Sequence, residues 1–476
     1  MTSDDIINIM HYFIQTYGCQ ANKADSERIA GVLEAMGFDE TSELDFADIV
    51  ILNTCSVRQS AENRVYSRME KLREMKKQKP NLKVIVAGCM VGPRGNTPRD
   101  SDIANRLKGA DKLIGTQDYS RLWEIFKDLA PTPGEYLNRK IPYKKMEKDQ
   151  GFILISSGCN NFCTFCIVPY ARGKEISRPM QEIIDETKDL VEKGYKKITL
   201  LGQNVNSYGA DLVLGKPLGG DRIQINELRR LRRDKRLQRL ENYNQHIRNQ
   251  ISKEDDINSN ILIDQPYNSS SAFAPGPFQD LSEIEASSNE KGEFSLPSGK
   301  VVKPVYVKHL GKVRVPTLFP YLLEEIASIP GIENLSFISS NPWDFSQELI
   351  DTIAKYPNID RHIHLPVQSG DNNVLKRMNR WYTREEYLEL INRIKAKIPQ
   401  ATFGTDIIVG FPGETDEEFQ NTVDLCQKVG FKVGFIAEYS VRPGNAASLM
   451  KDDVANSVKK NRFRTLDTLI NNISHN

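Results

Sequence analysis

Residues 158–166 read GCNNFCTFC, and this run indicates the fold and the chemistry of the chain most directly. It spaces Cys159, Cys163 and Cys166 as CxxxCxxC, with aromatic residues between the sulfurs. An iron–sulfur cluster normally takes four cysteine ligands, so a local set of three predicts a [4Fe–4S] cluster with one open iron. An open iron is a position where chemistry, rather than electron storage, takes place.

Structural zinc is the alternative for these three thiols, but it usually takes four ligands arranged as two CxxC-type pairs. No second pair lies nearby in the sequence. A cluster with three cysteines instead fits a small chelating ligand, such as the amino and carboxylate groups of S-adenosylmethionine. A reduced cluster can pass one electron to the sulfonium and yield a 5′-deoxyadenosyl radical. Phe162 and Phe165 would shield such a cluster from solvent.

The cysteine run follows a predicted strand and begins a series of alternating strands and helices. Strands are expected at residues 152–157, 198–202, 335–339, 362–366, 403–409 and 433–439, and helices at 178–193, 318–328, 345–355, 383–398 and 416–429. Thr415 and Glu418 form a capping box for the last helix. Six βα units are too few for a closed eight-stranded barrel. We therefore predict an open, partial (β/α)6 barrel with its site at the carboxyl ends of the strands.

A separate α/β unit precedes this barrel. Strands at 12–18, 49–54, 83–88 and 112–115 alternate with helices at 26–36 and 61–78, which predicts a parallel sheet, with Ser26 as the N-cap of the first helix. Cys19, Cys55 and Cys89 each follow a different strand, so they should converge at one edge of the sheet. The alternative is three buried structural cysteines. Cys426 falls inside a predicted helix and is expected in the core.

Two segments interrupt the α/β pattern. Residues 126–150 form a polar linker, and residues 212–312 are an insertion between barrel units. The stretch ELRRLRRDKRLQRLEN at 227–242 predicts a basic helix that either contacts RNA phosphates or is a solvated face. Residues 264–300 are rich in Ser, Asn, Pro and Glu and are expected to be disordered.

The composition of all 476 residues is that of a soluble globular protein, with 39% hydrophobic and 27% charged residues, and the cytoplasm is the default expectation for its location. No apolar run reaches the roughly 18 residues of a membrane span, and the acidic N-terminus does not resemble a signal peptide. Seven cysteines in a reducing compartment indicate metal or redox chemistry rather than disulfides. The net charge of +1 restricts any nucleic-acid site to a local patch.

Long stretches of the chain resemble a known family. The run GCNNFCTFCIVPYARG resembles the radical S-adenosylmethionine superfamily, and more closely its methylthiotransferases of the MiaB type, which act on tRNA. YGCQAN, NTCSVRQSAENRVYSR and AGC around Cys19, Cys55 and Cys89 resemble the N-terminal domain of that family. LLGQNVNSYG at 200–209, HLPVQSGDNNVLKRMNRWYTREEY at 364–387, TDIIVGFPGET at 405–415 and YSVRPGNAAS at 439–448 resemble its catalytic domain.

The resemblance implies domain bounds and two clusters. Residues 10–128 would be the methylthiotransferase domain and 150–465 the radical S-adenosylmethionine domain, with the C-terminal RNA-gripping domain of most relatives absent. Cys159, Cys163 and Cys166 would hold the cluster that cleaves S-adenosylmethionine. Cys19, Cys55 and Cys89 would hold an auxiliary [4Fe–4S] cluster that carries the sulfur. One S-adenosylmethionine would methylate that sulfur and a second would generate the radical that activates C2 of N6-isopentenyladenosine next to the anticodon.

The resemblance also implies residues for cofactor or substrate contact, each of which is otherwise a structural polar group. They are Gly202, Gln203, Asn204, Ser339, Ser340, His364, Gln368, Ser369, Asp406 and Arg442. Implied partners are tRNA and an electron donor of the flavodoxin or ferredoxin type, with the enzyme acting as a monomer and without a membrane. Rival functions are a sister methylthiotransferase, acting on threonylcarbamoyladenosine or a ribosomal protein, and a non-catalytic iron–sulfur RNA-binding protein.

Overall fold

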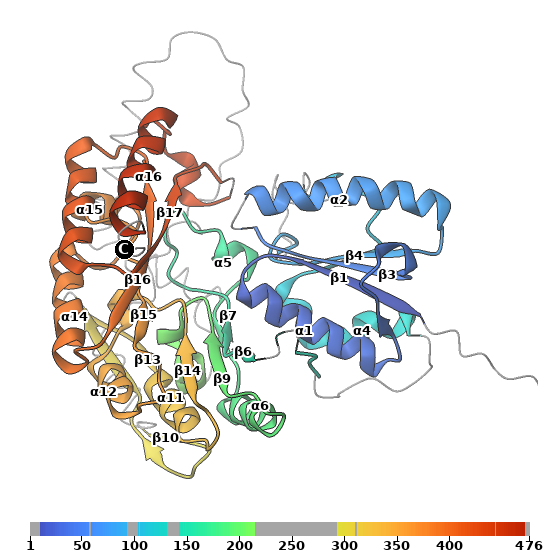
Figure 1. Ribbon diagram of the computed structural model, residues 1–476, viewed down its shortest axis with the longest axis horizontal. Coiled ribbons are helices and arrows are strands. Elements are labelled where there is room, and N and C mark those ends of the chain that lie inside the picture. The colour runs from blue at the N-terminus through green and yellow to red at the C-terminus, as the bar shows by residue number, and fades with distance from the viewer. Residues whose placement is uncertain are drawn as a thin grey trace, which may run out of the picture.

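The computed structural model describes residues 10–56, 59–92, 103, 105–130, 142–145, 147, 149–214, 293–309, 312–442 and 444–471. These residues form two α/β units that lie side by side (Figure 1). The basic run at 227–242 lies outside the described residues.

The N-terminal unit is built on one parallel sheet with the strand order β2-β1-β3-β4-β5. The strands are β1 (His11–Tyr17), β2 (Asp39–Glu40), β3 (Ile49–Thr54), β4 (Lys83–Gly88) and β5 (Lys112–Ile114). Every residue of the central strand β3, IVILNT, is buried. A parallel strand covered on both faces is expected to read as such a continuous apolar run.

Helices cover both faces of this sheet (Figure 1). α1 (Gln20–Ala35) and α4 (Leu122–Phe126) pack on one face, and α2 (Gln59–Gln78) packs on the other. Ile51 points into the first core and its neighbour Leu52 into the second, as the alternation along a strand requires.

Helix α1 begins six residues earlier than the sequence predicted, so the assignment of Ser26 as its N-cap is wrong. The N-cap is Cys19, and the side-chain oxygen of Asn22 accepts a hydrogen bond from the Cys19 backbone nitrogen at 3.4 Å. Ser26 is buried within the helix, where its hydroxyl lies 2.7 Å from that of Thr16 and accepts from Asn53 at 2.8 Å. The polar residues of the first turns are therefore helical because they bond across to the sheet.

The second unit contains six parallel strands in two sheets. They are β6 (Gln150–Leu154), β9 (Lys197–Leu201) and β14 (Asn334–Phe337), then β15 (His362–His364), β16 (Thr402–Val409) and β17 (Val433–Glu438). The sheet orders are β14-β9-β6 and β15-β16-β17. A parallel bridge between Leu335 and Ile359 joins β14 to the segment that leads into β15. The strands therefore follow one another in space in chain order.

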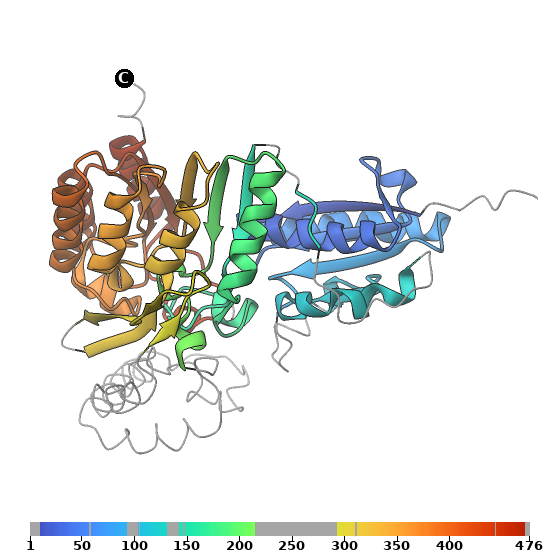
Figure 2. The ribbon, with the colours of Figure 1, turned by 90° about the horizontal axis from the view of Figure 1, so that it is seen from below.

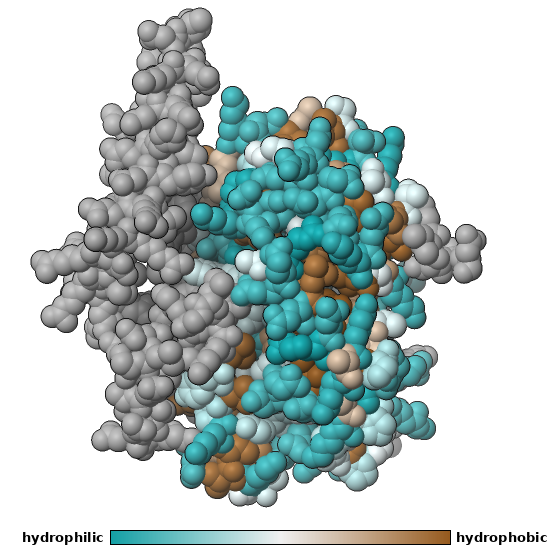
Figure 3. Space-filling view, turned by 90° about the vertical axis from the view of Figure 1, so that its left-hand side faces the viewer, coloured by the Kyte–Doolittle hydropathy of each residue, from teal (hydrophilic) through white to brown (hydrophobic). Residues whose placement is uncertain are grey.

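Helices cover the outer face of these six strands and enclose the largest core of the described residues (Figure 1). They are α6 (Met180–Glu192), α11 (Phe319–Ala327), α12 (Gln347–Lys355), α14 (Arg384–Lys397), α15 (Asp416–Val429) and α16 (Asn456–Ile470). Cys426 of α15 belongs to this core, as predicted. Seen from outside, the helices present a largely hydrophilic surface with scattered apolar residues (Figure 3). None of the described helices is long and apolar enough to cross a membrane.

Short elements complete the second unit. They are β7 (Ser156–Ser157), β8 (Ile176–Ser177), α5 (Val168–Ala171), α7 (Ala210–Leu214) and α13 (Asn372–Arg377). Two hairpins pair β10 (Phe294–Ser295) with β11 (Val301–Val302) and β12 (Val305–His309) with β13 (Lys312–Thr317). The 3-10 turns of both units lie at Leu44–Phe46, Thr116–Arg121, Lys127–Leu129, Val205–Ser207, Pro342–Asp344 and Ala446–Leu449. Disorder was predicted for 264–300, and for residues 293–300 this is wrong. They form β10 and its turn, because Leu296 packs into the main core.

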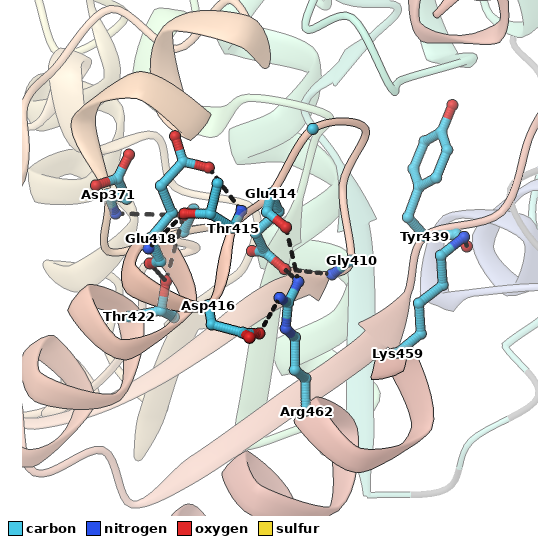
Figure 4. A network of polar contacts seen from close by, with 12 residues as sticks. Asp371, Gly410, Glu414, Thr415, Asp416, Glu418, Thr422, Tyr439, Lys459 and Arg462 are labelled. Carbon is cyan, nitrogen blue, oxygen red and sulfur yellow. Dashed lines mark hydrogen bonds and ion pairs between the residues drawn. The ribbon is translucent and has the colours of Figure 1, made fainter. Parts of the chain in front are cut away.

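Helix α16, which the sequence did not predict, closes the edge formed by β17 through buried charges (Figure 4). The buried Arg462 guanidinium donates to the buried Glu414 carboxylate at 2.7 Å and to the exposed Asp416 carboxylate at 2.7 Å. The Lys459 ammonium donates to the Tyr439 carbonyl at 3.2 Å. The capping box of Thr415 and Glu418 begins α15 beside this network, as predicted.

The two units meet along α1. Ala21 and Ala24 of α1 pack against Phe152, Leu154 and Leu201 of the other unit. Figure 2 shows the N-terminal unit against the strands β6 and β9. Since a side chain added at Gly151 would meet Leu190 of the covering helix α6, the neighbouring Phe152 points away from the helices. Helix α1 therefore lies on the inner face of the strands.

The predicted linker takes part in this junction. The Lys145 ammonium, almost fully buried, bonds Glu27 of α1 at 2.9 Å and Glu186 of α6 at 3.4 Å. It also donates to the Phe152 carbonyl at 2.6 Å. A buried cation shared by one carboxylate from each unit fixes their relative position, because breaking such a set leaves uncompensated charge.

Candidate active site

Three cysteines of the N-terminal unit lie at the carboxyl ends of adjacent parallel strands. Cys19 follows β1 and is exposed, whereas Cys55 after β3 and Cys89 after β4 are buried. The Cys89 backbone nitrogen donates to the Thr54 carbonyl at 2.9 Å, which ties the ends of β3 and β4 together. The structure therefore brings these three predicted site residues to one edge of the sheet.

The buried amide of Asn22 links these thiols to the sheet. Its oxygen lies 3.5 Å from the Cys19 sulfur, and its nitrogen lies 3.9 Å from the Cys89 sulfur. The same nitrogen donates to the Asn53 side chain at 3.2 Å and to the Thr54 carbonyl at 3.1 Å. Asn22 was not predicted, although its position three residues after Cys19 at a strand-to-helix turn was a usable signal.

The other three cysteines lie in the loop after β7, with Cys159 buried and Cys163 and Cys166 half-buried. Segments from much later in the chain hold this loop. The Thr164 backbone nitrogen donates to the Met378 carbonyl at 3.1 Å, and the Asn445 amide donates to the Phe165 carbonyl at 2.7 Å. The sulfurs therefore take their positions from residues more than two hundred positions away, rather than from the loop alone.

Backbone conformation shapes the same loop. Phe162 has a φ of 46°, in the left-handed region that non-glycine residues rarely adopt, and the Asn379 amide secures its carbonyl at 3.0 Å. Gly158 has a φ of +82°, and a side chain there would come within 1.9 Å of the Lys174 carbonyl oxygen. Strain held by surrounding contacts is typical of functional sites.

One arginine donates a hydrogen bond to a sulfur of each cysteine set, and neither arginine was predicted from the sequence. Arg172 donates through Nε to the Cys89 sulfur at 3.1 Å. Arg380 donates through Nη1 to the Cys163 sulfur at 3.3 Å, and its guanidinium lies 4.6 Å from the Trp343 ring. Cationic donors at sulfur favour thiolates, and they would offset the negative charge of a bound cluster. Neither arginine is near its cysteine in sequence, so only the fold reveals them.

Burial governs the acidity of the thiols without a cluster. It raises the pKa of Cys89 to about 11, although the Arg172 charge acts in the opposite direction. Burial raises the pKa of Cys166 to about 12, with the neighbouring Cys163 adding to the effect. These thiols therefore retain their protons at neutral pH, and a cluster that binds thiolates must displace them.

Polar groups gather past the ends of β6, β9 and β14, where the sequence predicted Gly202, Gln203, Asn204, Ser339 and Ser340. Buried atoms that find no hydrogen-bond partner within the described residues are Ser156 Oγ, Asn160 Nδ2, Asn204 Oδ1, Asn206 Nδ2, Ser340 Oγ and Asn341 Oδ1. Such atoms are rare in folded proteins, because buried polar groups usually pair with protein, a ligand or ordered water. The set fits a ligand with amino, carboxylate and hydroxyl groups. Ser156, Asn160, Asn206 and Asn341 are additions to the predicted residues.

The predicted residues on the second sheet divide into two groups. His364 and Asp406 face each other with Nε2 and Oδ1 3.3 Å apart, and the Gln368 backbone nitrogen donates to the Asp406 carbonyl at 2.9 Å. Ser369 is fully buried and lies 3.3 Å from the Thr422 hydroxyl, a structural position. Arg442 is half-buried in the loop after β17.

Phe435 on β17 is a further residue that the sequence did not single out. Its ring is 59% exposed and lies 6.0 Å from the His364 ring. A side chain at Gly434 would meet Ile470 of the covering helix α16, so Phe435 points to the opposite, inner face. An exposed aromatic ring beside polar groups is a surface on which a nucleobase can stack.

Comparisons with known proteins agree with this architecture. The family described as "Uncharacterized protein family UPF0004" matches residues 11–109, and the "Radical SAM superfamily" matches residues 153–251 and 314–426. Two curated relatives named tRNA-2-methylthio-N(6)-dimethylallyladenosine synthase, from Pelotomaculum thermopropionicum and Carboxydothermus hydrogenoformans, are each 35% identical to this chain. Each alignment spans 97% of this chain, with 82% of the first relative and 84% of the second.

Among solved structures, a radical S-adenosylmethionine methyltransferase from Kitasatospora setae aligns with a TM-score of 0.47 and 12% identity. The alignment covers 90% of this chain and 72% of that one.

Proposed function

Because the chain belongs to the family of tRNA-2-methylthio-N(6)-dimethylallyladenosine synthases, we propose that it adds a methylthio group to C2 of N6-isopentenyladenosine next to the anticodon of tRNA. The observation that carries this proposal is the pair of three-cysteine sites. One lies on each unit, and Arg172 from the second unit bonds a sulfur of the first. A reaction that makes a radical at one cluster and takes sulfur from another needs two such sites close together.

The enzyme uses two [4Fe–4S] clusters and S-adenosylmethionine. We assign Cys159, Cys163 and Cys166 to the cluster that binds S-adenosylmethionine, and Cys19, Cys55 and Cys89 to the auxiliary cluster. When bound, these groups supply the radical and the methylthio group. The protein's own contribution is to hold three thiolates at each site and to bring a guanidinium to one sulfur of each set.

The domain boundaries that we propose are residues 10–128 for the methylthiotransferase domain and 150–465 for the radical S-adenosylmethionine domain, with residues 212–312 as an insertion. The family matches at 11–109 and at 153–251 with 314–426 support the two domains, while the second match includes residues 212–251 of the proposed insertion and is interrupted only at 252–313. We also propose that the six strands β6 to β17 form an open, partial (β/α)6 barrel. Their order in space and the bridge from Leu335 to Ile359 support it.

The inner face of this barrel would receive S-adenosylmethionine and the target base. The orphaned polar atoms of Asn204 and Ser340 would bind the methionine end of S-adenosylmethionine, together with Gly202, Gln203 and Ser339. His364 and Asp406 would contact the cofactor or the base, with Gln368 and Arg442 as neighbours, while Phe435 would offer its exposed ring for stacking. Helix α1 on the same face would exclude water from the space between the two cysteine sites.

We further propose that a flavodoxin- or ferredoxin-type protein donates the electrons and that the enzyme acts as a cytoplasmic monomer. Both cysteine sites and their arginines come from one chain, which supports the monomer. The absence of a membrane-spanning helix among the described residues is compatible with this location.

Nucleoside analysis tests the function. A strain that lacks this protein should accumulate N6-isopentenyladenosine in its tRNA and lose the 2-methylthio derivative, and the wild-type gene should restore it. A gene with Cys163→Ala should not. Normal levels of the derivative in the deletion strain would refute the proposal, and loss of methylthiolated threonylcarbamoyladenosine or of the modified ribosomal aspartate would support a sister enzyme instead.

A further inference from the structure

The Arg172 side chain belongs to one domain and forms hydrogen bonds with residues of the other. Arg172 follows α5 in the segment after Cys166, so it belongs to the radical S-adenosylmethionine domain. Its Nε donates to the Cys89 sulfur at 3.1 Å, and its Nη2 donates to the Asp25 carboxylate at 2.7 Å. Only 2% of the Arg172 side chain is exposed, and Asp25 is fully buried.

This arrangement is more than an interdomain ion pair. A guanidinium that only paired with a carboxylate would frequently direct two parallel N–H groups at both of its oxygens. Here Nε is directed at sulfur instead, while Arg172 Nη1 and Asp25 Oδ1 are both buried with no hydrogen-bond partner within the described residues. The order of groups is sulfur, cation and anion, which places the positive charge next to Cys89 and the negative charge behind it.

We propose that Arg172 is a positioning residue that sets the electrostatic environment of the auxiliary cluster, with Asp25 holding it against the Cys89 sulfur. The inference rests on the proposed function, because it takes Cys19, Cys55 and Cys89 as ligands of that cluster. Reduction adds negative charge to a cluster, so a nearby cation favours the reduced form and a nearby anion opposes it. The guanidinium contacts the Cys89 sulfur only when the two domains are docked. Docking therefore sets the reduction potential of the auxiliary cluster.

The test measures the reduction potential of the auxiliary cluster in the full-length chain. Cys159, Cys163 and Cys166 are replaced by alanine so that one cluster remains, and the reconstituted protein is titrated while the electron paramagnetic resonance signal is followed. Arg172→Gln should lower the midpoint potential, and Asp25→Asn should raise it. A purely structural role predicts no shift, or shifts of the same sign, and either result would overturn the inference.

A second comparison remains valid if Arg172→Gln fails to fold because it leaves Asp25 charged and buried. Asp25→Asn is compared with the double variant Asp25→Asn/Arg172→Gln, in which no stranded carboxylate remains. The double variant should have the lower midpoint potential of the two. Equal potentials would contradict the role of Arg172 without any appeal to folding.

Two controls separate this inference from the function on which it rests. Arg384→Gln removes an arginine that pairs with Asp424 and donates to the Asn421 carbonyl, away from the contact between the domains, and it should leave the midpoint potential unchanged. Iron and sulfide are also measured in the parent with three alanines. If that parent binds no cluster, the assignment of Cys19, Cys55 and Cys89 fails. If it binds one and the predicted shifts are absent, only the inference about Arg172 fails.

Discussion

Cys159, Cys163 and Cys166 lie in one short loop, whereas Cys19, Cys55 and Cys89 come from the ends of three strands. The first set nevertheless depends on distant residues, because Met378 and Asn445 hold its backbone. The second set is positioned by the sheet itself and by one asparagine. The comparison teaches that a local motif in sequence need not be a local structure.

The first prediction separates the two sets by function. Cys163→Ala should abolish both the cleavage of S-adenosylmethionine to 5′-deoxyadenosine and the methylthiolation of tRNA. Cys55→Ala should abolish methylthiolation but retain cleavage, because the loop at residues 158–166 stays intact. Chromatography of 5′-deoxyadenosine and nucleoside analysis measure the two activities, and each variant should lose half of its iron. Loss of cleavage in both variants would show that the sets are not independent.

The second prediction concerns the backbone of the loop. Gly158→Ala should destabilise the fold by about 3 kcal/mol, because a left-handed backbone and a collision with the Lys174 carbonyl act together. Gly194→Ala is the matched control. Its φ is +91° but nothing lies within 4 Å, so only the strain of about 1 kcal/mol applies. Urea unfolding measures the free energy of unfolding of both variants. Equal decreases would mean that the loop moves away from the methyl group added at residue 158.

The third prediction exchanges one supporting amide for the other. Asn22→Ala should remove the bonds to Asn53 and to the Thr54 carbonyl, and with them the auxiliary cluster, while the other cluster remains. Asn445→Ala should leave the Phe165 carbonyl unpaired and cause loss of the cluster at Cys159, Cys163 and Cys166, while the auxiliary cluster remains. Each substitution should cost about 2 kcal/mol, since it leaves buried polar groups unpaired. Iron content and 5′-deoxyadenosine formation measure the two losses, and loss of both clusters in either variant would contradict separate support.

The sequence predicted the strands and their alternation with helices because buried parallel strands such as 49–54 are continuous apolar runs. It also predicted the six cysteines as candidates, since their spacing and positions after strands are visible in the sequence. It misplaced the start of α1, because Asn22, Asp25 and Ser26 have low helix propensity and are helical only through contacts with the sheet and with Arg172.

The arginines could not be predicted, because no rule of spacing connects Arg172 with Cys89 or Arg380 with Cys163. Arg172 reaches Cys89 because the two units dock, and Arg380 reaches Cys163 because of the turn that follows α13. Helix α16 was missed for a related reason. Its buried Lys459 and Arg462 read as surface residues until the network around Glu414 is known.

The smallest expected effect concerns Arg380, the counterpart of Arg172 at the loop. Arg380→Lys keeps a cation near the Cys163 sulfur but loses the contacts of the guanidinium with the Trp343 and Tyr382 rings, so the free energy of unfolding should fall by about 1 kcal/mol. The cluster should still assemble, as judged by iron content and by its electron paramagnetic resonance signal. Arg380→Met removes the charge as well and should lower the midpoint potential of that cluster. If Lys and Met gave the same potential, the charge of Arg380 would have no part in tuning it, and the resemblance between the two arginines would be one of geometry alone.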